Sequence, residues 1–184
     1  MIRVLVTDGM EKGAIEELKN KGFEVVEKFY EPEFLGDELK NFDVIVVRSA
    51  TKVRKAIIDK AAESGKLKLI IRGGVGVDNI DVAYAEEKGI KVTNTPNASS
   101  ASVAELALAH MFAISRFVNI SNVAMRQSKW DKKKYTGVEI GGKTLGLIGF
   151  GRISKELAKK ASALGMTVIY TDIIGKAKGF DEYE

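Results

Sequence analysis

Short apolar runs alternate with helical stretches over the first half of the chain, and this alternation limits the fold more than any other feature. The apolar runs occupy residues 2–7, 23–26, 43–48, 67–72 and 90–93, and the helical stretches occupy residues 11–20, 33–40, 53–63 and 81–88. Strands that alternate with helices pair in parallel, because each helix returns the chain to the same end of the sheet. The sequence therefore predicts an α/β fold with a doubly wound parallel sheet, in a flavodoxin-like domain over residues 1–96.

Two of these runs are apolar almost without interruption. Residues 44–47 read VIVV, and residues 69–71 read LII. Strands of this composition are typical of sheets that helices cover on both faces. We therefore expect residues 1–96 to form a complete domain with both faces covered.

A glycine-rich turn lies near residue 149, between a predicted strand and a predicted helix. Gly149 and Gly151 carry no side chain, so a diphosphate can approach the backbone amides of Gly151, Arg152 and Ile153 at the start of the helix. The helix dipole favours negative charge at the same place. The next strand ends at Asp172. This order predicts the first β-α-β unit of a Rossmann dinucleotide-binding domain, within residues 97–184.

Asp172 indicates which dinucleotide would bind. A carboxylate at this position accepts hydrogen bonds from the adenosine ribose hydroxyls and repels a 2′-phosphate, so NAD is expected in preference to NADP. Ser154 stands where the third glycine of the motif would be, which weakens the match. The alternative is a tight strand-to-helix turn that binds nothing.

The segment between the two patterns is expected to be helical. Pro96 breaks the alternation, residues 102–105 read SVAE and suggest a capping box, and a helix over 103–117 is apolar on almost every side. Such a helix is expected in a domain junction or a subunit interface. His110 lies in it, and we expect a polar residue with one local hydrogen bond on a mostly buried helix in preference to a catalytic base. A second helix is predicted near 119–128.

Composition excludes several classes of chemistry. The chain has no cysteine and a single histidine, which excludes disulfides, thiol nucleophiles, cysteine-ligated metals and multi-histidine metal sites within one chain. No run of about 18 apolar residues and no leader pattern is present, so we expect a cytoplasmic protein without a membrane segment. The net charge is +4, but 29 basic residues are spread among 25 acidic ones, so nucleic acid is not an expected partner.

Three further segments follow predicted parallel strands. They read VRSATKV at 47–53, RGGVGVDNID at 72–81, and NTPN at 94–97. Ligands of open parallel sheets bind at the carboxyl ends of the strands. Together with Lys129-Trp130 and the glycine turn, these segments closely resemble the D-isomer-specific 2-hydroxyacid dehydrogenases, over the chain from about residue 2 to residue 172.

The resemblance implies roles for the strand-end residues. Arg48 and Ser49 resemble the substrate-contacting pair of the family. Arg72, with Gly73 and Gly74, resembles the segment that meets the substrate carboxylate and the nicotinamide end of the cofactor, and an arginine fork suits a carboxylate or phosphate. The alternative for both arginines is a surface salt bridge.

Two other segments have implied roles. Val75 departs from the small polar residue of the family at this cofactor-binding position, so no hydrogen bond from its side chain is expected. The basic loop around Lys132 resembles a segment that reaches the substrate site of a neighbouring subunit, and a solvated run of charges is an equal alternative. The resemblance also implies that the helices over 103–128 build a two-fold dimer or a higher oligomer.

The implied function is NAD-dependent oxidation of a small anionic D-2-hydroxy acid. The expected reaction converts 3-phospho-D-glycerate to 3-phosphohydroxypyruvate, in serine biosynthesis. In the family an arginine holds the substrate, and a histidine paired with a glutamate exchanges the proton. None of these positions occurs in this chain, and neither His110 nor Glu105 matches them, so we assign no catalytic residue.

Two predicted strands do not make an independently stable sheet. We therefore expect the chain to be a fragment, a truncated product or part of an assembled oligomer, with weak NAD binding and no turnover alone. The alternatives are a non-catalytic NAD-responsive binding module and a hydroxypyruvate or glyoxylate reductase.

Overall fold

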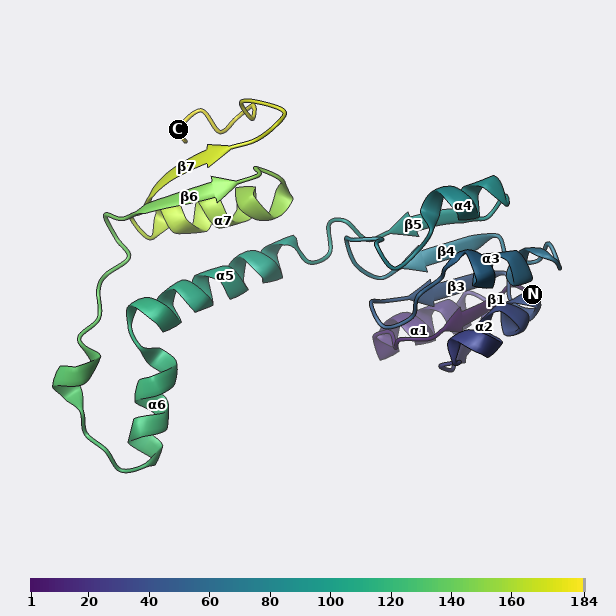
Figure 1. Ribbon diagram of the computed structural model, residues 1–184, viewed down its shortest axis with the longest axis horizontal. Helices are drawn as coiled ribbons and strands as arrows, with labels where there is room; N and C mark the ends of the chain where they lie inside the picture. The colour runs from purple at the N-terminus through teal and green to yellow at the C-terminus, as the bar shows by residue number, and fades with distance from the viewer. Residues whose placement is uncertain (184) are drawn as a thin grey trace. The chain divides into compact units, whose positions relative to one another are not determined.

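The computed structural model describes residues 1–183, which divide into two compact units between Ala98 and Ser99. The first unit is built on a five-stranded parallel sheet with the strand order β2-β1-β3-β4-β5 (Figure 1). This order is the doubly wound arrangement predicted from the sequence. The elements are β1 Arg3–Val6, α1 Lys12–Asn20, β2 Glu24–Glu27, α2 Pro32–Glu38, the 3₁₀ helix η1 Leu39–Asn41, β3 Val44–Val47, α3 Lys55–Ala62, β4 Leu69–Arg72, α4 Val82–Glu87 and β5 Lys91–Asn94.

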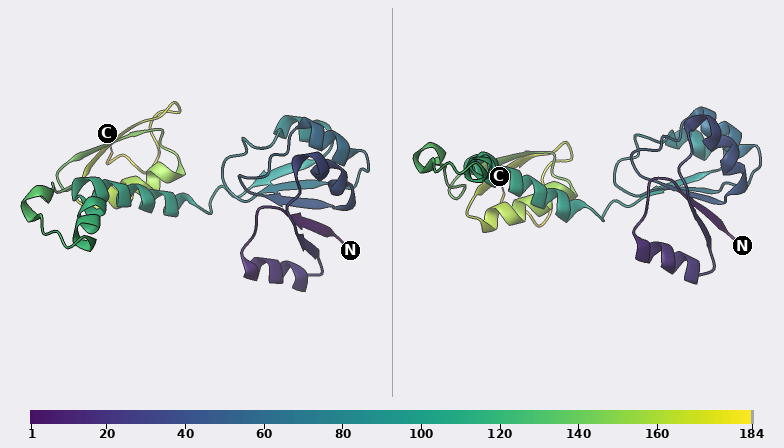
Figure 2. Two further views of the ribbon diagram at one scale, coloured as in Figure 1. Left: turned by 60° about the horizontal axis from the view of Figure 1, so that its bottom comes forward. Right: turned by 90° about the horizontal axis from the view of Figure 1, so that it is seen from below.

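Helices cover the two faces of this sheet unequally. Helices α2, α3 and α4 lie on one face, whereas α1 lies on the other (Figure 2). The first of these faces holds a core of fully buried aliphatic side chains, which includes Leu5, Leu35, Ile45, Ile58 and Ile70. The α1 face leaves an apolar cavity of about 700 Å³ against β3 and β4. The expectation of complete cover is therefore wrong for the described residues, because one short helix does not span the sheet.

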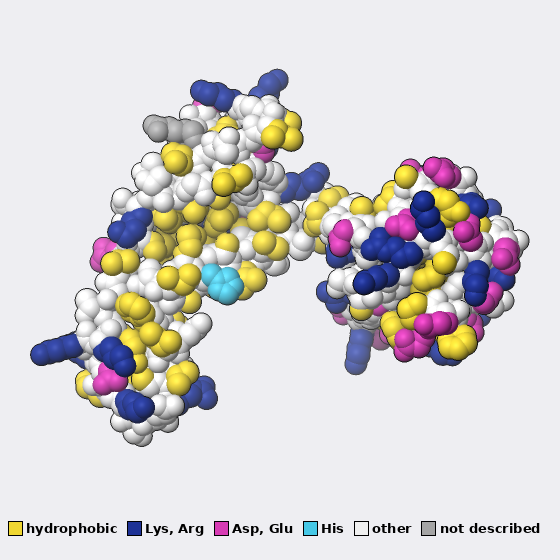
Figure 3. Space-filling view, viewed as in Figure 1, with side chains coloured by type: hydrophobic (Ala, Val, Ile, Leu, Met, Phe, Trp, Pro, Cys, Tyr) yellow, Lys and Arg dark blue, Asp and Glu magenta, His cyan; other side chains and the backbone are white. Residues whose placement is uncertain are grey.

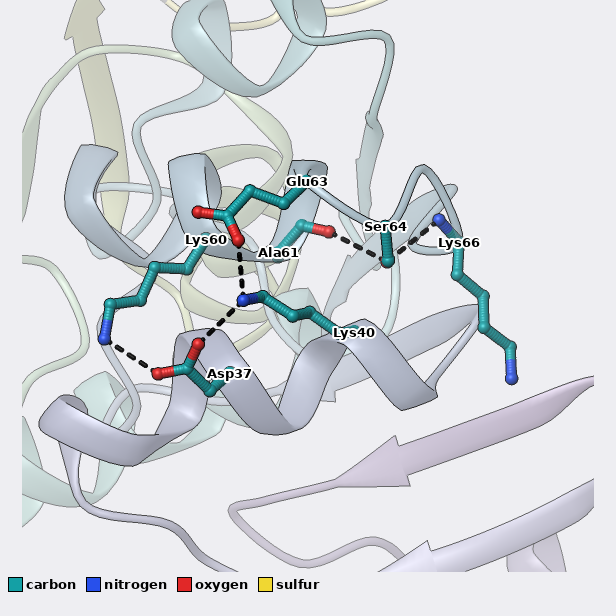
Figure 4. A network of polar contacts seen from close by, with 7 residues as sticks. All are labelled: Asp37, Lys40, Lys60, Ala61, Glu63, Ser64 and Lys66. Atoms are coloured by element: carbon teal, nitrogen blue, oxygen red, sulfur yellow. Dashed lines mark hydrogen bonds and ion pairs between the residues drawn. The ribbon is translucent and has the colours of Figure 1, made fainter.

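Ion pairs join α2 and η1 to α3 (Figure 4). Lys40 Nζ lies 2.9 Å from Asp37 Oδ1 and 2.6 Å from Glu63 Oε2, and Lys60 Nζ lies 2.8 Å from Asp37 Oδ2. Hydrogen bonds from Lys60 and then from Lys40 lower the pKa of Asp37 to about 2. Because these side chains reach solvent, the pairs contribute little to the stability of the fold.

Over its described residues, 99–183, the second unit contains a two-stranded parallel sheet and four helical segments. Its core joins Leu147 and Val168 of the strands to Leu157, Ala158 and Ala104 of the helices. The predicted β-α-β unit is thus confirmed, and Ile148 on the open side of its sheet is 95% exposed. The elements are α5 Ser100–Ser115, α6 Val118–Arg126, the 3₁₀ helix η2 Lys132–Tyr135, β6 Thr144–Ile148, α7 Arg152–Ala163 and β7 Thr167–Thr171.

Helix α5 begins earlier than predicted and ends at a sharp corner. Ser102 lies inside the helix, Ser99 is its N-cap, and that cap makes no side-chain hydrogen bond, so the predicted capping box is wrong. Phe117 has φ of 55°, and α6 leaves the corner at 63° to α5. Among residues 1–183, no single helix is long and apolar enough to span a membrane. Helices α5 and α6 reach such a length and apolar composition only together, as this bent pair.

Candidate functional site

In the first unit, the residues after β3 and β4 come together because these strands are parallel neighbours. Arg48 and Ser49 follow β3 and are exposed. Gly73, which follows β4, donates its N–H to Val47 O at 2.8 Å. A Cβ atom on Gly73 would lie only 3.6 Å from Arg48 Cγ, so the stem of Arg48 runs beside this glycine. The structure thus brings Arg48, Ser49 and Gly73 to one edge of the sheet.

Arg72 lies against the next residue of the same loop. Gly74 has φ of 158°, and a Cβ atom there would stand 1.2 Å from Arg72 Nη1. Any side chain at position 74 would therefore displace the guanidinium group. Arg72 Nε is buried and has no hydrogen-bond partner among the described residues, and Nη1 lies 3.5 Å from Gly73 O. No ion pair occupies this arginine in the described part of the chain, which leaves donors for an anionic ligand.

The glycine loop is tied to the end of β5. Thr95 N donates to Gly74 O at 3.0 Å, and Asn94 Nδ2 donates to Val75 O at 2.6 Å. The side chain of Val75 is 39% exposed and offers only apolar contact. The carbonyl groups of this loop are thus directed toward β5.

Sequence analysis assigned no role to Asp8 and Asn79, which hold the segment from Arg48 to Thr51. Asp8 Oδ2 accepts the backbone N–H of Arg48 at 2.7 Å and that of Thr51 at 3.0 Å. Asn79 Nδ2 donates to Arg48 O at 2.8 Å and to Thr51 O at 2.7 Å. Asp8 lies two residues after the end of β1, so its place close to a strand end was the available signal.

Burial and hydrogen bonding act in opposite directions on the Asp8 carboxyl. Partial burial raises its pKa, but the side-chain and backbone donors of Thr51, followed by the backbone of Arg48 and the hydroxyl of Thr7, together lower that pKa below its ordinary value. Asp8 is therefore a carboxylate at neutral pH. A charged acceptor makes stronger hydrogen bonds than a neutral one.

In the second unit, the glycine turn joins β6 to α7. Gly149 has φ of 86° and donates its N–H to Thr171 O at 2.8 Å. Gly151 is the N-cap of α7, with φ of −77° and no side-chain cap. Apart from its chain neighbours, a Cβ atom at either glycine would meet no atom of the described residues within 4 Å. The space beside Gly151 and the free amides of the first helical turn fit a diphosphate.

Asp172 directly follows β7, where the sequence pattern places it. Its carboxylate accepts N–H groups from Phe150 and from Ile174, the latter at 3.0 Å. The hydrogen bond from Ile174 and then that from Phe150 lower the pKa of Asp172. A carboxylate has about four acceptor positions, so capacity remains for ribose hydroxyls.

An aromatic cluster supports this turn, and sequence analysis did not identify it. The buried Phe150 ring stacks on Tyr170 with centroids 3.8 Å apart, and Phe180 meets it edge-on at 5.3 Å. Tyr170 also accepts the backbone N–H of Ala177 at 2.9 Å through its hydroxyl oxygen. The side chain between the two glycines therefore anchors the turn to β7 and to the segment after it.

Two other residues of interest lie on the surface of the second unit. Lys132 begins η2 and lines a shallow hollow with Trp130, Asp131, Lys133 and Lys134. His110 is exposed on α5 within the single chain, and its expected place on a helix buried in a domain junction or subunit interface stays a prediction. Apolar side chains gather over this unit in the space-filling view (Figure 3).

A doubly wound parallel sheet with arginines at its strand ends, followed by a nucleotide-type glycine turn, is the arrangement of an α/β protein of the dinucleotide-binding class. The model of the D-isomer specific 2-hydroxyacid dehydrogenase catalytic domain matches residues 4–173. The chain belongs to this family.

Individual relatives agree with this assignment. The chain is 51% identical to hydroxypyruvate reductase of Thermotoga maritima, covering 92% of this chain and 55% of that protein. It is 46% identical to D-3-phosphoglycerate dehydrogenase of Methanocaldococcus jannaschii, covering 94% of this chain and 32% of that protein. A solved structure of D-lactate dehydrogenase from Aquifex aeolicus, complexed with NAD and lactic acid, aligns with a TM-score of 0.81 at 27% identity, covering 98% of this chain and 54% of that one. The chain thus spans about a third to a half of the length of these relatives.

Proposed function

We propose that this chain provides the substrate-holding and coenzyme-holding parts of an NAD-dependent dehydrogenase that oxidises 3-phospho-D-glycerate to 3-phosphohydroxypyruvate. The main observation is the combination of two arginines beside a glycine loop with a β6–α7 turn that leaves room for a diphosphate. Membership of the 2-hydroxyacid dehydrogenase family supports the proposed reaction type. The relative from Methanocaldococcus jannaschii, a D-3-phosphoglycerate dehydrogenase, supports the proposed substrate.

The proposed roles follow from the chemistry of each group. Arg48, Ser49 and Arg72 bind the carboxylate and phosphate of the substrate through charge-assisted hydrogen bonds, and the bare backbone of Gly73 and Gly74 allows close approach. Bound NAD supplies the acceptor for the hydride that leaves the substrate carbon. Val75 contributes an apolar contact on the coenzyme side.

The second unit holds the coenzyme in this proposal. The amides of Gly151, Arg152 and Ile153 bind the diphosphate. Asp172 accepts the ribose hydroxyls, and its negative charge disfavours the 2′-phosphate of NADP. Because both ligands are small and the chain has no cysteine that an oxidising compartment would pair, we propose a cytoplasmic location.

We also propose that α5 and α6 form the contact of a two-fold dimer. Their exposed side chains include Ile114 at 76%, Leu106 at 57% and Val123 at 54% exposure. Exposed apolar patches of this kind mark protein interfaces. In such a dimer Lys132 would serve the substrate site of the partner subunit, where a phosphate needs a cation.

Calorimetry of the 184-residue chain with NAD tests the proposal. We expect weak but measurable binding, with NADP bound less well than NAD. The Asp172→Asn variant should bind NAD about tenfold less tightly and should discriminate less against NADP. Glu139→Gln is the matched control, because it removes one exposed negative charge from the same unit. Absence of heat with NAD, or an unchanged titration in Asp172→Asn, would refute the cofactor assignment.

Reduction of hydroxypyruvate is a second candidate function, favoured by the 51% identity to the Thermotoga maritima reductase. Its substrate lacks the phosphate. A chain that binds D-glycerate as tightly as 3-phospho-D-glycerate would favour this second candidate.

A further inference from the structure

The segment from Arg48 to Thr51 carries the substrate-contacting pair of the proposed function, yet it has no regular secondary structure to hold it. It leaves β3 at Val47 and joins the rest of the unit again at Val53, which pairs with Ile80. Val53 N donates to Asn79 O at 2.9 Å, and Asp81 N donates to Val53 O at 3.1 Å. Its conformation therefore depends on side chains from other parts of the unit.

Asp8 and Asn79 divide the backbone groups of this segment between them. The carboxylate of Asp8 accepts the N–H groups of Arg48 and Thr51, and the amide nitrogen of Asn79 donates to the C=O groups of the same two residues. The hydroxyl of Thr51 also donates to Asp8 Oδ1. All four backbone polar groups at the two ends of the segment are thus satisfied by two side chains, and Ser49 is left at the exposed tip.

The two side chains come from distant parts of the chain. Asp8 is 40 residues from Arg48, and Asn79 is 31 residues from it. Asn79 is only 5% exposed, so its amide is shielded from water that would compete for these hydrogen bonds. Both hydrogen bonds of Asn79 Nδ2 go to carbonyl oxygens, which defines the orientation of the amide.

We propose that Asp8 and Asn79 are positioning residues for substrate binding, which hold Arg48 and Ser49 in the conformation that receives the anionic substrate. This proposal rests on the proposed function, in which Arg48 and Ser49 contact the substrate. Neither positioning residue touches the substrate.

The negative charge of Asp8 allows a test that distinguishes positioning of the Arg48 segment from charge repulsion of the substrate. Removing a carboxylate close to an anion site strengthens anion binding if only charge matters. Removing a positioning acceptor weakens binding, because the Arg48 segment loses its conformation. The two effects have opposite signs.

The test uses the 184-residue chain, with 3-phospho-D-glycerate as the probe and the amide signals of Ser49 and Gly74 as the NMR readout. Asp8→Asn and Asn79→Ala should each weaken binding by about tenfold or more. The amides of Arg48 and Thr51 should exchange faster with solvent in Asp8→Asn, while those of Ile45 and Ile70 should keep their protection. Glu16→Gln, which replaces an exposed acid on α1, measures the effect on binding of losing one negative charge.

A double-mutant cycle separates positioning from a general loss of stability. Asp8→Asn should cost much less affinity in an Arg48→Ala background than in the wild type, because the positioned group is already gone. Additive effects, or tighter binding in Asp8→Asn, overturn the proposal. If Asp8→Asn does not fold, Thr51→Val decides, since it removes the hydroxyl that contacts Asp8 and Thr7; unchanged affinity in that variant overturns the proposal too.

Failure of the proposed function gives a different result. If the wild type does not bind 3-phospho-D-glycerate, or if Arg48→Ala binds it normally, the assigned substrate site is wrong. If Arg48→Ala alone weakens binding and neither Asp8→Asn nor Asn79→Ala does, only the positioning proposal fails.

Discussion

The two glycines of the β6–α7 turn are required for different physical reasons. Gly149 has a positive φ that an L-amino acid with a side chain adopts at a cost of about 1–2 kcal/mol. Gly151 has an extended backbone that any residue adopts, and its missing side chain leaves only empty space within the chain. Folding therefore explains glycine at position 149, whereas the diphosphate site that we propose would explain it at position 151.

Alanine substitutions should separate these two reasons. Gly149→Ala should lower the free energy of unfolding by about 1–2 kcal/mol. Gly151→Ala should change it by less than about 0.5 kcal/mol, because loss of a favourable N-cap and reduced freedom of the unfolded chain act in opposite directions. The Gly151 variant should nevertheless lose about tenfold or more in NAD affinity. Urea unfolding and calorimetry measure the two quantities, and normal NAD affinity in Gly151→Ala would contradict this explanation.

The sequence predicted where some site residues lie, but it did not predict the contacts that others make. Arg48, Ser49, Arg72, Gly73 and Gly74 were predictable as neighbours, because they all lie at or just after the ends of adjacent strands of a parallel sheet. The contacts made by Asp8 and Asn79 were not, since they depend on side-chain rotamers and on partners 28 to 43 residues away. The same holds for the ring stacking of Phe150 on Tyr170.

At the scale of secondary-structure elements, the ion pairs between α2 and α3 have a consequence for acid stability. The pKa of Asp37 falls from 3.8 to about 2 in the folded chain. A carboxyl with a lowered folded pKa stabilises the fold above its unfolded pKa, and this contribution is lost as the pH falls through the folded value. The relevant window therefore runs from about pH 4 down to about pH 2.

Asp37→Asn should flatten the acid side of the stability curve. In the wild type, the thermal midpoint of unfolding should fall across that window, and the fall should be smaller in the variant because the ion pairs of residue 37 with Lys40 and Lys60 are gone. The effect is small, since the pairs are exposed. Thermal unfolding followed by circular dichroism at a series of pH values provides the measurement. Glu16→Gln is the control, since it replaces an acid outside this network of ion pairs. Equal slopes in Asp37→Asn and the wild type would show that these pairs do not contribute.

The boundaries of elements were harder to predict than their existence. Helix α5 was expected from residue 103, but Ser99, Ser100 and Ser102 all suit a cap, and the structure begins the helix at Ser100. Helix α3 was expected from residue 53 and starts at Lys55, because Val53 pairs with Ile80 instead. Both differences come from competition between local signals and tertiary contacts.

At the scale of the whole molecule, the apolar surface of α5 and α6 predicts self-association. Ile114→Glu should raise the dissociation constant of the dimer by at least about tenfold, because it places a charge in the proposed contact. Ile174→Glu, which changes a side chain of 83% exposure outside these helices, should leave association unchanged. Sedimentation equilibrium over a concentration series measures both. A monomeric wild type, or equal effects in the two variants, would contradict the proposed dimer.

At this scale, the sequence predicted least well how helices cover the two faces of the sheet. Runs such as VIVV indicate strands whose side chains are buried, but they do not indicate which segment of the chain covers each face of the sheet. The α1 face of the first unit shows this difference, because its apolar strands form only a small packed cluster around Val4, Val6 and Val46 and line a cavity beside it.

Phe117 carries a consequence for the shape of the second unit. With φ of 55°, it is a non-glycine residue in the left-handed region, and its ring lies 6.2 Å from that of Tyr135. Continuing α5 into α6 as one helix would require helical torsions at Phe117, whose ψ is 31°, and at Arg116, whose φ and ψ are −116° and 7°. The backbone of these two residues thus determines whether the apolar side chains of the two segments lie along one helix axis or two.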